Sequence, residues 1–274
     1  MNQIKPLKVA LALMLISGAS VSYANTFMVA DKSLETQDYY HQCGDKCPEI
    51  RYQLVDTGHV WLDTIINKAV VSNLAINDQD DSPTAKRWQA FKAIAQPSTT
   101  QLTKQFDFAI SELVKSNLEF RKQTSSDLNY AVSVEPSYLG HKTLSNGNDL
   151  ELFAITSEQY LGGAHGMHWT HFYLFDMQKK RQLTLNDIVI ANQRPALEEL
   201  VKAQYQAYLK KNNMNPDEMK DMWMFFLTDN VTFTNRGLTF LYQPYEITPY
   251  VMGMPEFTIP YAQLTNLIKA DYLP

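Results

Sequence analysis

The sequence predicts an α+β fold in which helices pack against an antiparallel or mixed sheet. Segments whose apolar residues recur every three or four positions, typical of amphipathic helices, are followed by segments whose apolar residues recur at every second position, typical of strands. The 274 residues, 45% of them hydrophobic, suffice for one large domain or two small ones. No internal repeat or low-complexity tract marks a flexible linker.

Residues 1–24 have the features of a signal peptide. Lys5 and Lys8 form a basic end, residues 9–16 form an apolar core, and Ser-Tyr-Ala at 22–24 is a small-x-small cleavage site. The apolar core is about half as long as a membrane-spanning helix requires, so we expect cleavage and no membrane span afterwards. The mature protein is therefore expected to be soluble and periplasmic or secreted.

Residues 25–48 are predicted to be an N-terminal segment with a local disulfide. Cys43 and Cys47 are the only cysteines, and an exported chain meets an oxidising compartment, which favours a bond between them. By the chain-entropy estimate, so short a loop contributes about 2 kcal/mol. A zinc site that adds His41 to the two cysteines is the alternative, although no fourth ligand lies nearby in the sequence.

Residues 49–160 are predicted to form a helix-rich first module. Alternating apolar residues predict a strand at 50–54, and three- and four-residue spacing predicts helices at 62–74 and 102–121. The polar, acidic stretch 77–83 is expected to be a loop. Two more strands are expected at 130–134 and 150–160, joined through the hairpin-turn signal Asn146-Gly147.

Residues 161–274 are predicted to form a second module. The stretch 168–175 is apolar on both alternating faces, which predicts a central strand covered on both sides. Pro195 at a first-turn position leads into a helix that extends to Tyr208. The remaining expected elements are strands at 231–233 and 238–242 around the hairpin Asn235-Arg236-Gly237, a strand at 257–259 and a short helix at 261–268.

The charge balance argues against nucleic acid as a partner. The chain has 29 acidic and 24 basic side chains, and its formal net charge is −5 at pH 7. The longest basic cluster, Lys179-Lys180-Arg181, is expected to be a solvated turn rather than a phosphate-binding patch. A cationic partner fits the negative charge better.

Two segments carry residue types that are typical of recognition surfaces. Three of the ten glycines, Gly162, Gly163 and Gly166, fall within five residues and predict a tight, exposed corner that carries His165. The second segment, 244–253, is a loop in which prolines stiffen a backbone that carries tyrosines, and rigid tyrosines are favoured in interfaces and sugar-binding clefts. The expected binding residues are Gly162, Gly163, His165, Gly166, Pro244, Tyr245, Glu246 and Tyr250.

The order of the motifs resembles a known family. The corner at 160–166, the hairpin at 235–238, the run 243–250 that closes on Gly253, and Phe-Thr-Ile-Pro-Tyr at 257–261 follow one another in a characteristic order. This order resembles the extracellular domain of the RsiV anti-sigma factors, which is also found as the non-catalytic N-terminal region of PdaC-type peptidoglycan deacetylases. The resemblance extends over most of residues 45–270, although the first half matches only in general pattern.

The resemblance implies binding rather than catalysis. In the anti-sigma factors this domain captures lysozyme, a strongly basic enzyme, so the implied function is an exported envelope protein that binds or inhibits lysozyme or another basic cell-wall-active protein. A peptidoglycan-binding accessory module is the alternative, and a cell-wall hydrolase or deacetylase with an unrecognised site is a third. The resemblance implies no cofactor.

The sequence offers few residues for metal or deacetylase chemistry. His165, His168 and His171 invite a metal site, but on a strand His168 points to the opposite face from the other two. A PdaC-type deacetylase would need a catalytic domain with paired aspartates, and the only Asp-Asp pair, Asp80-Asp81, lies in a polar loop. We therefore expect no metal, and a deacetylase would have to use a site that the sequence does not reveal.

Hydrolase chemistry has similarly weak support. No Gly-x-Ser-x-Gly elbow is present for a serine nucleophile. Glu246 and Glu256 are the one carboxylate pair considered for a glycosidase, and surface hydrogen bonding is the simpler explanation for them.

Overall fold

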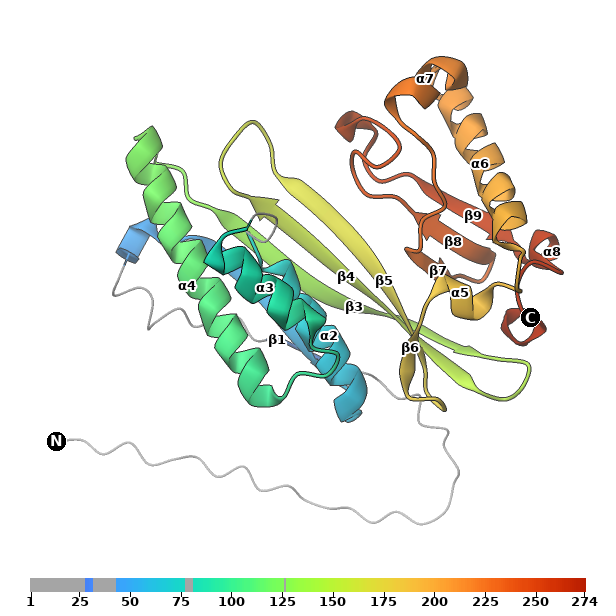
Figure 1. Ribbon diagram of the computed structural model, residues 1–274, viewed down its shortest axis with the longest axis horizontal. Helices are drawn as coiled ribbons and strands as arrows, with labels where there is room; N and C mark the ends of the chain where they lie inside the picture. The colour runs from blue at the N-terminus through green and yellow to red at the C-terminus, as the bar shows by residue number, and fades with distance from the viewer. Residues whose placement is uncertain (1–27, 32–42, 77–80, 126) are drawn as a thin grey trace, which may run out of the picture.

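The computed structural model describes residues 28–31, 43–76, 81–125 and 127–274 (Figure 1). The α+β fold predicted from the sequence is confirmed: in this part of the chain, seven α-helices accompany a six-stranded mixed sheet and a three-stranded antiparallel sheet. The predicted signal peptide and the alternative zinc ligand His41 lie outside the described residues. No helix in the described ranges is both long and apolar enough to cross a membrane.

The large sheet has its strands in the order β1-β2-β3-β4-β5-β6. Strands β2 and β3 are parallel, and every other neighbouring pair is antiparallel. The strands are β1 (Met28–Asp31), β2 (Glu49–Asp56), β3 (Ala131–Thr143), β4 (Asp149–Tyr160), β5 (Met167–Asp176) and β6 (Arg181–Leu183).

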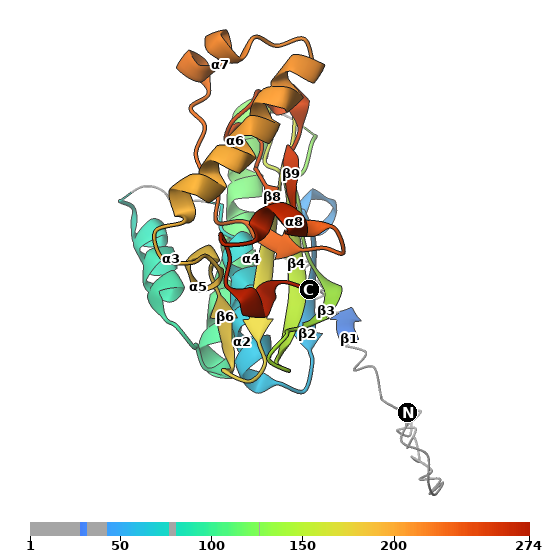
Figure 2. The same cartoon turned by 90° about the vertical axis from the view of Figure 1, so that its right-hand side faces the viewer.

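The crossover between the parallel strands β2 and β3 contains three helices that cover one face of the sheet. They are α2 (Val60–Asn73), α3 (Pro83–Ala93) and α4 (Thr99–Thr124), and Figure 2 shows α3 and α4 to one side of β3 and β4. Alternate strand residues point to this face of the sheet. Among them, Val134, Phe153 and Ile155 pack in one hydrophobic cluster with Leu62 and Ile110 from the helices. Burying these apolar side chains holds the first layer together.

The second half of the chain supplies a smaller sheet and the remaining helices. Strands β7 (Val231–Phe233), β8 (Gly237–Leu241) and β9 (Glu256–Pro260) form an antiparallel sheet. Helix α6 (Arg194–Lys211) lies alongside it (Figure 1), and the other helices are α5 (Leu185–Ile188), α7 (Pro216–Met222) and α8 (Tyr261–Leu264).

The small sheet covers part of the large sheet on the face opposite to α2–α4. Leu150, Leu152 and Leu174 have the opposite parity to Phe153 and Phe175, and they pack in a second hydrophobic cluster with residues of the small sheet and α6. Strands β4 and β5, on either side of residue 160, pair over ten positions. Residues of both predicted modules thus build the large sheet, and the division at 160/161 stays a prediction.

Strand β5 differs from the covered central strand predicted at 168–175. Leu174 and Phe175 are buried as expected, but residues 168–173 are only half-buried. The reason is the shortness of β6, which pairs only with residues 174–176 of β5. The predicted terminal helix at 261–268 is also too long, because α8 ends at Leu264.

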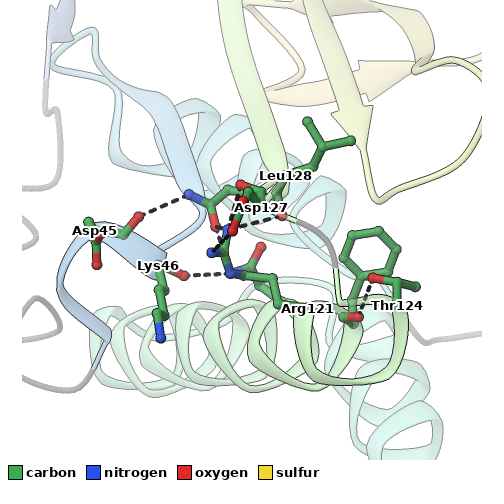
Figure 3. A network of polar contacts seen from close by, with 9 residues as sticks. Asp45, Lys46, Arg121, Thr124, Asp127 and Leu128 are labelled. Atoms are coloured by element: carbon green, nitrogen blue, oxygen red, sulfur yellow. Dashed lines mark hydrogen bonds and ion pairs between the residues drawn. The ribbon is translucent and has the colours of Figure 1, made fainter.

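The predicted disulfide between Cys43 and Cys47 is confirmed, and a polar network holds its loop against α4 (Figure 3). The side-chain amide of Asn117, on α4, donates to the carbonyl of Lys46 at 2.6 Å, and its oxygen accepts from the Tyr130 backbone N–H at 2.6 Å. Arg121 donates to the carbonyl of Asp127 at 2.6 Å. The loop, the end of α4 and the start of β3 are therefore fixed to one another.

Candidate functional site

The glycine-rich corner connects β4 to β5. Gly162 and Gly163 have φ of 81° and 115°, a backbone region that favours glycine. A Cβ at Gly162 would also overlap the ring of Phe120. The corner thus turns closely over the end of α4, and His165 is exposed there as predicted.

The proline–tyrosine loop lies between β8 and β9. Pro244 is buried, whereas the Tyr245 side chain is 46% exposed and its backbone has a φ of 67°. The Glu246 carboxylate accepts a hydrogen bond from the Gln243 backbone N–H at 2.7 Å and so helps to shape the loop. Tyr250 begins a short 3-10 turn that ends before Gly253.

The structure brings the corner and the loop together, 80 residues apart in the sequence. The Tyr250 hydroxyl donates to the carbonyl of Gly166 at 2.6 Å, and the rings of Tyr250 and His165 stack with centroids 4.1 Å apart. The Tyr245 hydroxyl lies 3.5 Å from Nε2 of His165. Two segments predicted separately therefore form one surface.

Two further aromatic residues join this surface. Trp223, which directly follows α7, stacks on Tyr245 with centroids 6.2 Å apart, and His168 meets the Tyr250 ring edge-on at 5.8 Å. We call His165, His168, Trp223, Tyr245 and Tyr250 the aromatic cluster. Sequence reasoning missed Trp223; the one available signal was its place in the run Met-Trp-Met-Phe-Phe at 222–226.

Exposed apolar side chains flank the cluster along the chain. Met222 and Met224, on either side of Trp223, are 68% and 80% exposed, and Val251, next to Tyr250, is 87% exposed. Large apolar side chains gathered at a surface mark a place where another molecule binds. The cluster and its flanks are therefore the strongest candidate for a recognition surface.

A groove of about 320 Å³ adjoins the cluster on the face of the large sheet opposite to α2–α4. Three residues of the groove lining also make the contacts described above, namely Gly166, His168 and Tyr250. Its floor is a row of cross-strand neighbours in which each residue is paired with the next, namely Arg51, Ser133, Glu158 and His168.

The chemistry of the groove is mixed. Arg51 forms an ion pair with Glu49, so the guanidinium charge is compensated within the groove. Glu158 is exposed and has no charged partner in the described part of the chain. Tyr160 and Tyr250 supply aromatic walls. Such a lining suits a cationic side chain or a sugar ring, because both bind carboxylates and aromatic faces.

The three histidines that suggested a metal site do not come together. His168 lies at the groove, His171 lies on the helix-covered face of β5, and the His165 ring stacks on Tyr250. Within the described ranges, no group of three or more His, Cys, Asp or Glu side chains is placed to hold a metal ion.

Fold and surface together define a two-sheet α+β protein with an exposed aromatic cluster beside a polar groove. A family described as "Protein of unknown function (DUF3298)" matches residues 186–262, the stretch that contains α6, the small sheet and the proline–tyrosine loop. A search of curated proteins gave no match. The family match does not confirm the resemblance to the RsiV and PdaC-type domains, which stays a prediction.

Two solved structures of this family share the fold. A DUF3298 family protein from Pseudomonas aeruginosa PAO1 is 20% identical with a TM-score of 0.59, over 90% of this chain and 95% of its own. A member from Bacteroides fragilis NCTC 9343 is 21% identical with a TM-score of 0.56, over 81% of this chain and 84% of its own. The likeness therefore extends well beyond residues 186–262, and at these identities it concerns the fold.

Proposed function

We propose that this chain is an exported binding protein of the bacterial envelope that captures a basic cell-wall-active protein, with lysozyme as the partner. The observation that carries the proposal is the contact of Tyr250 with Gly166 and His165, because it unites the two segments that the sequence assigned to binding. The resemblance to the RsiV sensor domain supplies lysozyme as the partner.

The aromatic cluster has the properties of an interface anchor. Tyr250 is held by one hydrogen bond and one ring stack, so little conformational entropy remains to be lost on binding. Tyr245 is exposed and is backed by Trp223. Tyrosine and tryptophan dominate the energetics of many protein interfaces, since each buries a large area with few rotatable bonds.

The charges around the cluster favour a basic partner. Helix α7, which ends directly before Trp223, carries Asp217, Glu218 and Asp221 against one lysine. Glu158 adds a carboxylate on the groove side. The field of these carboxylates would speed the approach of a cationic protein, and salt would weaken this effect, because the Debye length is about 8 Å at physiological ionic strength.

Calorimetry with residues 25–274 and a basic lysozyme of the common type tests the proposal. We expect saturable binding at micromolar concentrations, an affinity that falls as salt rises, and slower cell-wall lysis by the captured lysozyme. No heat of binding at about 10 µM would contradict capture of lysozyme. Binding without slower lysis would limit the function to capture.

Export is tested separately by the intact mass of the protein recovered from the cell envelope. The signal features predict a chain that begins at Asn25. A full-length mass would contradict export by cleavage.

Glycan binding is the second candidate, and the groove is the observation that favours it. Its volume, its two tyrosine walls and the Glu158 carboxylate suit a short saccharide. A titration with soluble peptidoglycan fragments distinguishes the candidates, since a glycan binder is indifferent to lysozyme. Glu158→Gln should weaken glycan binding if the groove is the site.

A further inference from the structure

A second cavity lies on the other face of the large sheet. It has a volume of about 350 Å³ and opens between α2 and the edge of β5, where β6 has not yet begun to pair. His171 and Tyr173 reach it from β5, because they have the parity of Phe175, which packs against the helices. It is therefore separate from the groove, whose floor includes His168.

The polar lining of this cavity is rich in hydrogen-bond donors and carries no carboxylate among the described residues. Two lysines line the cavity, Lys68 on α2 and Lys92 on α3. Hydroxyls come from Ser72 and Tyr173, and β6 adds the amide of Gln182. In a chain with a net charge of −5, such a concentration of positive charge without a carboxylate is a local exception.

The ammonium group of Lys68 has hydrogen-bond donors that no protein group in the described residues uses. Its ammonium donates to the carbonyl of Lys92 at 2.7 Å, near the end of α3, and this bond uses one of three N–H groups. Partial burial lowers the pKa of Lys68, since removing the ammonium from water disfavours its charge. A bound anion would offset that cost. Capping of α3 therefore uses one donor of Lys68 and leaves two N–H groups of this cavity-lining residue for another partner.

His171 and Tyr173 are neutral donors at physiological pH. Burial lowers the pKa of His171, so that its ring keeps one N–H and one bare nitrogen. Burial raises the pKa of Tyr173 to about 12, so its hydroxyl stays protonated. Within the described part of the chain this hydroxyl has no hydrogen-bond partner, and stacking on Phe175 fixes the ring. Tyr173 is half-buried and lines the cavity, so its unpartnered hydroxyl is available to a ligand there.

We propose that this cavity binds a small oxyanion, the carboxylate or phosphate group of a low-molecular-weight ligand, through Lys68, Tyr173 and His171. The ammonium supplies charge, and the hydroxyl and the imidazole N–H supply directed hydrogen bonds to the anion's oxygens. The volume leaves room for a ligand larger than the anionic group itself.

Titration of residues 25–274 with inorganic phosphate, and separately with acetate, tests the site by NMR of the histidine rings. We expect the His171 ring signals to shift saturably with one of the two anions, and the His165 signals to stay in place. Sodium chloride at matched ionic strength is the control and should leave His171 unchanged. The stronger anion distinguishes a phosphate ligand from a carboxylate ligand.

Three variants locate the binding. Lys68→Met keeps the aliphatic stem and removes the charge, and should weaken binding at least about tenfold. Tyr173→Phe keeps the ring and should weaken it several-fold. Lys86→Met, on the exposed side of α3, removes an equal charge outside the cavity and should leave the affinity unchanged.

The proposal fails if no saturable shift of His171 is found at about 10 mM of either anion. It also fails if Lys86→Met weakens binding as much as Lys68→Met, or if Lys68→Met and Tyr173→Phe both bind as the wild type does. Thermal unfolding of each variant confirms that the compared proteins are folded. The test is independent of lysozyme binding, which uses the other face.

Discussion

Tyr250 is the residue on which the candidate site depends. It donates a hydrogen bond to the Gly166 carbonyl, stacks on His165 and meets His168 edge-on, so one side chain contacts both the corner and β5. Its neighbours in the loop show why the sequence alone was not enough. Glu246, grouped with the binding residues by its position, uses its carboxylate to hold the Gln243 backbone N–H.

Gly162 allows the corner to approach α4. We predict that Gly162→Ala destabilises the fold by about 2 kcal/mol or more, because a positive φ and an overlap with the Phe120 ring act together. Gly163→Ala is the matched control, since its φ is also positive but its Cβ would meet open space. Urea unfolding compares the two. Equal losses of stability in both variants would show that the Phe120 ring moves away from the added Cβ of Gly162→Ala without destabilising the fold.

At the scale of elements, the apolar patterns located seven of the nine strands in the described residues and the long helices α2, α4 and α6, but they missed β1 and β6 and made β3 too short. Helix α3 was missed, although its start carries clear signals: the Ser82 side chain accepts from the Ala85 N–H, and Pro83 occupies the first turn. Its buried residues are Ala85, Trp88 and Phe91, and only the last two are large, which is too little for a clear periodic pattern. The hairpins at Asn146-Gly147 and Asn235-Arg236-Gly237 were right because their turns are local.

The site was predictable to the same limited extent. The corner and the loop are local motifs and could be proposed from the sequence. Three features of the sites join residues that are far apart in the chain. They are the contact between the corner and the loop, the stacking of Trp223 on Tyr245, and the shared cavity of Lys68 and His171. No local pattern specifies such contacts, since they depend on how the two sheets and the helices pack.

The start of α5 gives a prediction about pH. The Asp187 carboxylate accepts from Arg181 at 2.7 Å and from the Thr184 backbone N–H at 2.8 Å, which holds the pKa of Asp187 well below its usual range. A lowered folded-state pKa contributes stability above the ordinary pKa of about 4 and loses it as pH falls below that value. We therefore expect Asp187→Asn to destabilise the protein at pH 7 by about 1 kcal/mol.

Urea unfolding at pH 7 and pH 3 measures this effect. The gap in stability between wild type and Asp187→Asn should narrow at pH 3, because the Asp187 carboxyl of the unfolded chain is then largely protonated while that of the folded chain is still charged. A gap of equal size at both pH values would contradict the role assigned to the Asp187 charge.

At the scale of the whole molecule, two side-chain amides join the small sheet to the open edge of β5. Gln243 accepts from the Thr170 backbone N–H at 3.0 Å and donates to the Thr170 carbonyl at 2.7 Å. Asn230 accepts from the Phe172 backbone N–H at 2.8 Å and donates to the Thr170 carbonyl, also at 2.8 Å. These amides take the place of a strand partner and connect the layer that carries the proline–tyrosine loop to the layer that carries the corner.

Hydrogen exchange tests this connection. Gln243→Ala should speed exchange of the Thr170 amide, and Asn230→Ala should speed exchange of the Phe172 amide, because each variant removes the acceptor of one N–H. Each variant is the control for the other. If neither amide exchanges faster in its own variant, the side-chain amides do not protect the edge of β5.

The most direct test of the account is the affinity of a basic lysozyme for three versions of residues 25–274: wild type, Tyr245→Ala and Leu139→Ala. Tyr245 and Leu139 are both 46% exposed, but only Tyr245 belongs to the aromatic cluster. We predict saturable binding by the wild type, a loss of about 2 kcal/mol or roughly thirtyfold for Tyr245→Ala, and no change for Leu139→Ala. Absence of wild-type binding would contradict lysozyme capture, and equal affinities of all three folded proteins would contradict the aromatic cluster as its surface.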